Sequence, residues 1–181
     1  MAGLDNSYVD LYLVHWPVTK PLQESGDNYY ARNREIWRAM EDIYRSGRAK
    51  AIGVSNFSID DINNILEVAN VKPMVNQIKY HIGHHPDDIV KFCKKHDIVV
   101  EGYSSLGRGA VLQSEAVKML GQKYNATPAQ MAIRYNLQKG IVPLVKAENP
   151  VHQTENRRVD FEISHEDMKK LDQLEISSAN W

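Results

Sequence analysis

The feature of this sequence that most constrains its fold is a repeated alternation of strand-like and helix-like segments. Each strand-like stretch is apolar and then turns polar where it would leave a sheet. These stretches are residues 8–15, 49–57, 73–81, 97–107 and 140–148. Strands that alternate with helices are typical of a parallel sheet covered by helices. The sequence therefore predicts an α/β fold.

Helical periodicity fills the segments between the strands. A helix is expected over residues 33–46, where five apolar side chains recur at helical spacing. Residues 127–130, Thr-Pro-Ala-Gln, form a capping box with proline at the first helical position. Further helices are expected around Ile62–Ala69, from Pro86 onward, and at residues 114–124, 128–139, 150–157 and 165–174.

Polar and aromatic residues gather at the carboxyl ends of the predicted strands. They are His15 and Trp16, Ser55 and Asn56, Gln77, Tyr80 and His81, Tyr103, Ser104 and Ser105, and Lys146. An α/β barrel builds its active site from these strand ends. A doubly wound sheet would instead show a glycine-rich phosphate loop after its first strand, and none is present here. The pattern therefore favours a barrel-type site.

Composition narrows the choice of partners and compartment. The 181 residues carry a net charge of −1, which suggests no nucleic-acid or anionic-membrane partner. Cys93 is the single cysteine, so we expect no disulfide framework and a reducing compartment. No apolar run approaches the roughly 20 residues that span a bilayer, and no signal-peptide pattern precedes the first strand. These features predict a cytoplasmic protein without a membrane partner.

Five motifs in order resemble the aldo-keto reductase family, over essentially the whole chain. The motifs are DLYLVHWP, GVSNF, VNQIKYH, GYSSLG and PLVKAENPVHQTENRRVDFEIS. The resemblance implies a (β/α)8 TIM barrel that moves a hydride from a nicotinamide cofactor to an aldehyde or ketone. It implies neither a Rossmann fold nor a metal.

The resemblance also implies roles for individual residues. His15 matches the catalytic histidine that contacts the substrate carbonyl, and Trp16 matches an aromatic wall of the substrate pocket. Tyr103 matches the ring that stacks on the nicotinamide. The other matched cofactor positions are Ser55, Asn56 and Gln77 at the carboxamide, Ser104 and Leu106 beside the pyrophosphate, and Lys146, Asn149, His152, Glu155 and Asn156 around the adenosine.

The chemistry of these residues agrees with that implication. A planar stacking ring with fixed amide and hydroxyl partners would orient a nicotinamide. Lys146 suits a 2′-phosphate, and a helix starting near Pro150 would add backbone N–H groups that favour an anion. Ala147 stands where a serine is common and His152 where an arginine is common, so polar grip on that phosphate is reduced. We expect NADP(H) to be favoured, with NAD(H) possible.

The resemblance begins at what matches the fourth strand of the family barrel. A barrel of this kind typically has about 250 residues. In the family the first three strands carry a catalytic aspartate, a proton-donating tyrosine and a lysine, and nothing here matches them. We therefore expect an N-terminally truncated chain, with residues 1–181 forming one incomplete barrel domain of five C-terminal βα units and a C-terminal helix.

An incomplete barrel would leave unpaired strand edges. Residues 8–15 and 141–146 would present them, and exposed edges invite further strand pairing. The expectation is therefore self-association, strand exchange or a separate completing chain.

Several residues admit other interpretations. The three histidines of HIGHH (81–85) suggest a metal site, but their spacing is irregular and no acidic or thiol ligand is close, so no metal is expected. Tyr29 and Tyr30 are expected in a loop, either as surface residues or as a substitute acid. Cys93 is expected to be inert core packing. Trp181 could close over a substrate pocket or belong to a frayed terminus.

Two functions remain open at the level of sequence. The first is an NAD(P)H-dependent oxidoreductase that reduces aldehydes and ketones to alcohols, weakly or only with a completing chain. The second is a catalytically inactive module for nicotinamide-nucleotide binding or assembly.

Overall fold

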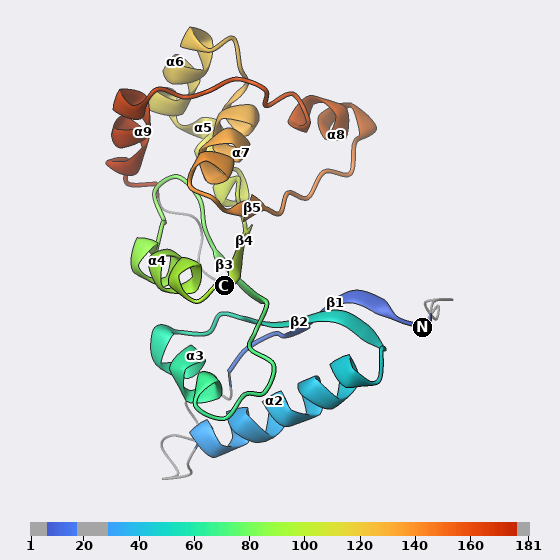
Figure 1. Ribbon diagram of the computed structural model, residues 1–181. Helices are drawn as coiled ribbons and strands as arrows, with labels where there is room; N and C mark the ends of the chain where they lie inside the picture. Colours follow the sequence, from blue (N-terminus) through green and yellow to red (C-terminus); the bar gives the residue numbers. More distant parts are fainter. Residues whose placement is uncertain (1–6, 18–28, 177–181) are drawn as a thin grey trace. The chain divides into compact units, whose positions relative to one another are not determined.

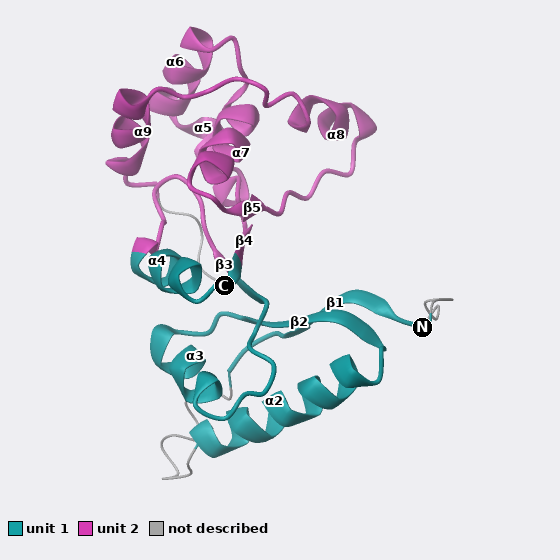
Figure 2. Ribbon diagram, viewed as in Figure 1, with its two compact units in different colours: residues 1–77, 88–99 teal, residues 78–87, 100–181 magenta. Residues whose placement is uncertain are grey.

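The computed structural model describes residues 7–17 and 29–176 (Figure 1). The chain divides into two compact units (Figure 2). Unit 1 consists of residues 1–77 and 88–99, and unit 2 of residues 78–87 and 100–181. The strands follow one another in chain order in a five-stranded sheet. This arrangement agrees with the predicted alternation of strands and helices.

Unit 1 is built on parallel strands with helices between them. Its elements are β1 (Val9–Val14), α2 (Tyr29–Arg45), β2 (Ala49–Ser55), α3 (Ile59–Leu66), the first part of β3 (Val75–Lys79), and most of α4 (Asp87–Lys95). Strands β1 and β2 pair over most of their length, from Val9 opposite Ala49 to Val14 opposite Val54. Strand β3 pairs with β2, which places Ser55 opposite Gln77.

Helix α2 begins four residues before its predicted start. Tyr29 and Tyr30 form its first turn, with ring centroids 4.2 Å apart, so the expectation that they lie in a loop was wrong. The helix buries Trp37 and Met40. The Trp37 indole N–H also donates to the carbonyl oxygen of Val71 at 2.9 Å, so this large side chain is buried with its polar atom satisfied.

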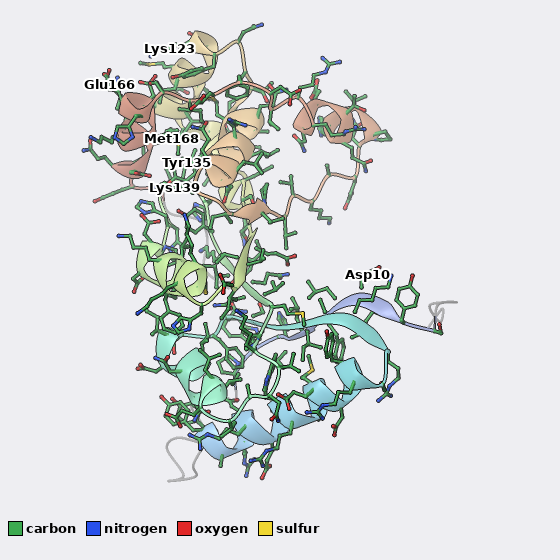
Figure 3. The ribbon with its side chains drawn as sticks, viewed as in Figure 1. Asp10, Lys123, Tyr135, Lys139, Glu166 and Met168 are labelled. Carbon is green, nitrogen blue, oxygen red and sulfur yellow. The ribbon has the colours of Figure 1, made fainter. Side chains whose placement is uncertain are left out.

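Unit 2 holds the rest of the sheet and a group of short helices. Its elements are β4 (Val99–Tyr103) except for Val99, η1 (Gly107–Gly109), α5 (Ala110–Gln113), α6 (Glu115–Lys123), α7 (Pro128–Gln138), β5 (Val142–Pro143), α8 (Pro150–Asn156) and α9 (His165–Asp172). Figure 3 labels Tyr135 and Lys139 beside α7, and both side chains bind Asp172 of α9. These contacts join the two helices.

Strands β4 and β5 are both shorter than the sequence suggests. Strand β4 ends at Tyr103 because Ser104 has φ of 55°, a left-handed conformation that leaves the extended region. Strand β5 contains only Val142 and Pro143. Its pairing with β4 covers two residue pairs, and the Leu144 N–H that follows donates to the Gly102 carbonyl oxygen at 2.8 Å.

The segment after β4 has an unusual backbone that the sequence analysis did not anticipate. Ser104, Gly107, Arg108 and Gly109 all have left-handed φ values, between 54° and 94°. Two backbone hydrogen bonds close the turn, from Gly107 N to Ser104 O at 2.7 Å and from Gly109 N to Leu106 O at 2.9 Å. We call residues 104–109 the left-handed segment. The short helices η1 and α5 follow from it.

Each unit has its own apolar core. In unit 1 the fully buried side chains include Trp37, Ile52, Phe57, Ile62 and Ile65; in unit 2 they include Tyr80, Met131, Tyr135, Ile141, Ile163 and Leu171. Cys93 is completely buried in unit 1, which confirms the expectation that it belongs to the core. Among the residues that the structure describes, no helix has the length and apolarity needed to cross a bilayer.

Candidate functional site

Four of the expected site residues of unit 1 meet at the carboxyl ends of its strands. We call His15, Ser55, Asn56 and Gln77 the strand-end cluster. The Ser55 hydroxyl donates to the Gln77 carbonyl oxygen at 2.8 Å, and the Asn56 backbone N–H donates to the same oxygen at 2.9 Å. The parallel register that sets Ser55 opposite Gln77 brings these groups together.

Asn56 links this cluster to the first strand. Its side-chain amide donates to the carbonyl oxygen of His15 at 3.0 Å and to the Ser55 hydroxyl at 3.1 Å. Asn56 has φ of 61°, a left-handed conformation that asparagine tolerates better than most residues. The turn after β2 therefore directs the amide toward the end of β1.

His15 and Trp16 lie just beyond β1. Both are exposed, and their ring centroids lie 6.0 Å apart. The backbone of His15 is fixed by Asn56, while Trp16 keeps about half of its surface accessible, at 51%. An exposed aromatic beside a held histidine suits contact with a small organic molecule.

In unit 2, Tyr103 is the last residue of β4 and Ser104 follows it. The Tyr103 carbonyl accepts a hydrogen bond from the Tyr80 N–H at 3.2 Å, which fixes the backbone below the ring. Burial raises the pKa of the Tyr103 phenol, against an opposing influence of Arg108, so the ring remains neutral near pH 7. Tyr103 can therefore present an uncharged aromatic face.

Ser105 has a structural role that the sequence analysis did not assign. Its side chain is buried, and its hydroxyl donates to the carbonyl of Gly102 at 2.8 Å and approaches that of Leu144 at 3.3 Å. Ser105 therefore ties the end of β4 to the chain that follows β5. The sequence marked it only as one more polar residue at a strand end.

A hollow of about 290 Å³ lies in unit 2. Five of the expected cofactor residues line it, namely Leu106, Lys146, His152, Glu155 and Asn156. Its other lining residues are Leu112, Thr127, Pro128, Ala129 and Ala147. The structure thus brings together residues from the segments that follow β4 and β5, from α5, from the start of α7 and from α8.

Thr127–Ala129 also line this hollow, and the sequence pattern does not indicate that role. Their capping box predicts only the start of α7. In the structure Thr127 Oγ1 accepts from the Gln130 N–H at 3.2 Å, and Gln130 Oε1 accepts from the Thr127 N–H at 2.8 Å. The same Gln130 side chain donates through Nε2 to the carbonyl of Glu155 at 2.9 Å. The Gln130 side-chain amide therefore links the start of α7 to α8, and both of these elements line the hollow.

Asn149 is the one adenosine-end residue that does not line this hollow. Its side-chain oxygen accepts from the Val151 N–H at 2.9 Å, so Asn149 is the N-cap of α8. That N–H is one of the groups expected to favour an anion, and it is already satisfied. Gln153 Nε2 donates to the Ala147 carbonyl at 2.8 Å and holds the preceding loop against α8.

The charges around the hollow are partly balanced. Lys146 Nζ lies 2.7 Å from Glu148 Oε1, and both side chains are mostly exposed. His152 and Glu155 are exposed as well. Apolar walls with a few polar groups are typical of a pocket for a small organic ligand.

The histidines of residues 81–85 have protein partners. His81 is buried, and its Nδ1 lies 2.8 Å from the Ile82 carbonyl; burial lowers its pKa. His85 Nε2 lies 3.0 Å from the Asp172 carbonyl. Across residues 7–17 and 29–176 no group of three or more potential ligands could hold a metal ion. Trp181 lies outside the described residues.

Comparison with known proteins places these observations in a family. The model of the Aldo/keto reductase family matches residues 2–176. A glyoxal reductase of Bacillus subtilis is 37% identical over 175 residues, which cover 96% of this chain and 59% of that protein. An NADPH-dependent alpha-keto amide reductase of Saccharomyces cerevisiae is 36% identical over 185 residues, covering 96% of this chain and 58% of that protein.

A solved structure gives the same result for the fold. The crystal structure of an aldo-keto reductase of the silkworm Bombyx mori, complexed with NADPH, superimposes with a TM-score of 0.82 at 32% identity. The match covers 96% of this chain and 56% of that one. The chain thus spans less than two thirds of the length of the relatives that it matches.

Proposed function

The chain belongs to the aldo/keto reductase family, and from that premise we propose that it binds a nicotinamide nucleotide and takes part in reducing small aldehydes or ketones to alcohols. NADP(H) is the favoured nucleotide and NAD(H) is an alternative. Two relatives support this choice: the alpha-keto amide reductase of Saccharomyces cerevisiae is NADPH-dependent, and the silkworm aldo-keto reductase was crystallised with NADPH. We further propose that residues 1–181 act as one incomplete domain in the cytoplasm.

The observation that carries the proposal is the hollow of unit 2. Five residues that the family resemblance assigned to the nucleotide line it together, although they are up to 50 positions apart in the chain, from Leu106 to Asn156. Lys146 would hold the 2′-phosphate by charge, and Leu106 would lie against the apolar part of the ligand. His152, Glu155 and Asn156 would contact the adenosine.

The strand-end cluster would hold the nicotinamide carboxamide. Ser55, Asn56 and Gln77 offer hydroxyl and amide groups from adjacent strand ends, and hydrogen bonds to backbone carbonyl oxygens hold Ser55 and Asn56 in place. Such fixed partners reduce the orientational freedom that the ligand loses on binding. Tyr103 would stack on the ring. When bound, the nucleotide supplies the hydride.

His15 and Trp16 would face the carbonyl substrate. A histidine N–H can donate to a carbonyl oxygen and so stabilise negative charge that develops on it. Asn56 holds the backbone of His15, which favours one position for that donor. Trp16 would form an apolar wall beside it.

The chain on its own is proposed to be a weak catalyst. No position of these 181 residues matches the aspartate, tyrosine and lysine that the family uses to donate the proton. Turnover would therefore be slow, or would require self-association or a second chain that supplies those groups. The same observation supports a second candidate function, a nucleotide-binding or assembly module without turnover.

The decisive experiment is a titration with NADPH followed by quenching of tryptophan fluorescence, with Trp16 as a reporter. Saturable quenching that is lost in Tyr103→Ala supports the proposed site. Met119→Ala removes an exposed side chain on α6 and serves as the control. Absence of saturable binding in the unchanged protein would contradict the proposal.

Turnover then separates the two candidate functions. Carbonyl-dependent oxidation of NADPH, measured at 340 nm, should be slow and should fall further in His15→Ala if the chain is a reductase. Binding without turnover supports the inactive module. Turnover that His15→Ala leaves unchanged would contradict the assignment of His15.

A further inference from the structure

The cation expected to hold a 2′-phosphate already has a partner. Lys146 Nζ lies 2.7 Å from Glu148 Oε1, with the two side chains 85% and 81% exposed. Of the described residues that line the hollow, Lys146 alone is positively charged when His152 is neutral, and Glu155 is negative. The Lys146 charge is therefore paired with the Glu148 carboxylate, and a second carboxylate, that of Glu155, lines the same hollow.

A 2′-phosphate and a 2′-hydroxyl respond differently to this arrangement. A phosphate monoester carries a charge between about −1.5 and −2 near pH 7. It would have to displace the Glu148 carboxylate from Lys146 and then tolerate that carboxylate nearby. A ribose hydroxyl carries no charge, so it meets neither penalty and can donate a hydrogen bond to a carboxylate.

From this ion pair we propose that Glu148 is a specificity-determining residue, which lowers the affinity of the site for NADPH relative to NADH. The inference rests on the proposed function of the hollow. It assigns to Glu148 a role that neither the sequence motifs nor the lining of the hollow indicates. The substitutions at Ala147 and His152 act in the same direction, since both positions lack the polar groups common in the family.

The size of the effect follows from the exposure of the pair. Exposed ion pairs and like-charge contacts are each weak in water and are screened by salt. Replacing the Glu148 carboxylate by an amide releases Lys146 and removes the repulsion between that carboxylate and the 2′-phosphate. Together these two changes should raise the NADPH affinity about three- to tenfold. The effect of Glu148 on NADPH affinity should shrink as the salt concentration rises, whereas its effect on NADH affinity should be small at every salt concentration.

The test compares dissociation constants for NADPH and NADH in the full chain. Glu148→Gln should tighten NADPH binding about three- to tenfold and leave NADH binding unchanged. Glu115→Gln is the matched control, because Glu115 forms an exposed ion pair with Lys118 at 2.8 Å in α6 and the variant changes net charge equally. Thermal melting of each variant reports whether it folds.

Lys146→Met tests whether the effect operates through the lysine. In that background Glu148→Gln should give a smaller gain in NADPH affinity, because no cation is left to release. An undiminished gain would overturn the ion-pair argument. An unchanged ratio of NADPH to NADH affinity in Glu148→Gln would overturn the inference while leaving the proposed function intact. Failure of the unchanged protein to bind either nucleotide would overturn both.

Discussion

The side-chain amide of Asn56 donates a hydrogen bond to the backbone carbonyl oxygen of His15, across 41 residues of sequence and a distance of 3.0 Å. The backbone N–H of Asn56 also donates to Gln77. One residue therefore connects the ends of β1, β2 and β3. The position of the histidine depends on a turn that lies in another part of the chain.

Replacing Asn56 should weaken the fold and displace His15. Asn56→Ala removes both side-chain hydrogen bonds. It also places alanine, which has a Cβ but no polar side chain, in a left-handed conformation. We therefore expect the free energy of unfolding to fall by about 2–4 kcal/mol. Asn56→Gly loses the same hydrogen bonds but adopts the left-handed conformation readily. It should therefore be the more stable variant by about 1 kcal/mol in urea unfolding. Equal stability of the two variants would contradict the strain argument.

Gln130 should act as a positioning residue for the hollow. Gln130→Ala removes the capping box of α7 and the hydrogen bond to the Glu155 carbonyl, with an expected loss of about 1–3 kcal/mol in stability and weaker NADPH binding. Gln130→Glu keeps an acceptor for the Thr127 N–H but has no N–H to donate to Glu155.

The two variants at position 130 separate stability from binding. Urea unfolding should show most of the lost stability restored in Gln130→Glu, while fluorescence titration should show NADPH affinity still reduced. Full recovery of NADPH affinity in Gln130→Glu would show that the hydrogen bond to the Glu155 carbonyl does not position α8 beside the hollow.

Acid should destabilise unit 2 through Asp167. This carboxylate is buried and accepts hydrogen bonds from Lys123, Tyr124 and Lys170, which hold its pKa well below its usual range. The unfolded chain binds a proton at about pH 4, before the folded protein does. The stabilisation is therefore complete above that pH and declines as the pH falls below it.

The variant Asp167→Asn isolates this contribution. It should be less stable at pH 7, and its stability should fall less between pH 6 and pH 3 than that of the unchanged protein. Asp10→Asn alters an exposed carboxylate on β1 and should leave the pH dependence nearly unchanged. Parallel pH profiles for Asp167→Asn and the unchanged protein would contradict the assignment.

Gly53 should not tolerate a side chain. A Cβ at this position would lie 2.5 Å from the Val75 carbonyl oxygen, within the pairing of β2 and β3. Gly53→Ala should therefore lower the free energy of unfolding by more than about 2 kcal/mol. In Gly47→Ala the new Cβ meets no atom within 4 Å, and the only cost is that alanine must adopt the left-handed φ of Gly47. The free energy of unfolding should therefore fall by only about 1 kcal/mol. Thermal melting compares the two, and the reverse order would contradict the packing argument.

The helices could be predicted from the sequence because their start signals are local. The capping residues Ser114, Thr127 and Ser164 each precede a helix in the structure, close to its predicted start. Two other boundaries were harder to predict. Strand β4 ends where Ser104 adopts a left-handed conformation, and helix α2 starts before the first residue of its apolar stripe.

The candidate site was predicted from motifs rather than from geometry. The order of the motifs identified Leu106, Lys146 and His152, which line the hollow. It did not identify Thr127–Ala129, because their proximity to Glu155 depends on a tertiary hydrogen bond from Gln130. Local patterns indicate which residue types end a strand or start a helix, but not which helix lies beside which strand end.

The left-handed segment after β4 has a consequence for the rate at which a ligand binds. Ser104 and Arg108 adopt left-handed conformations, and backbone hydrogen bonds from Gly107 and Gly109 close the turn around them. Because these bonds come from the segment itself, we expect it to keep this conformation before and after a nucleotide binds beside Leu106, so that binding does not wait for it to reorganise. In stopped-flow mixing, the observed rate should rise in proportion to nucleotide concentration, without the plateau that a slow rearrangement of the segment would impose.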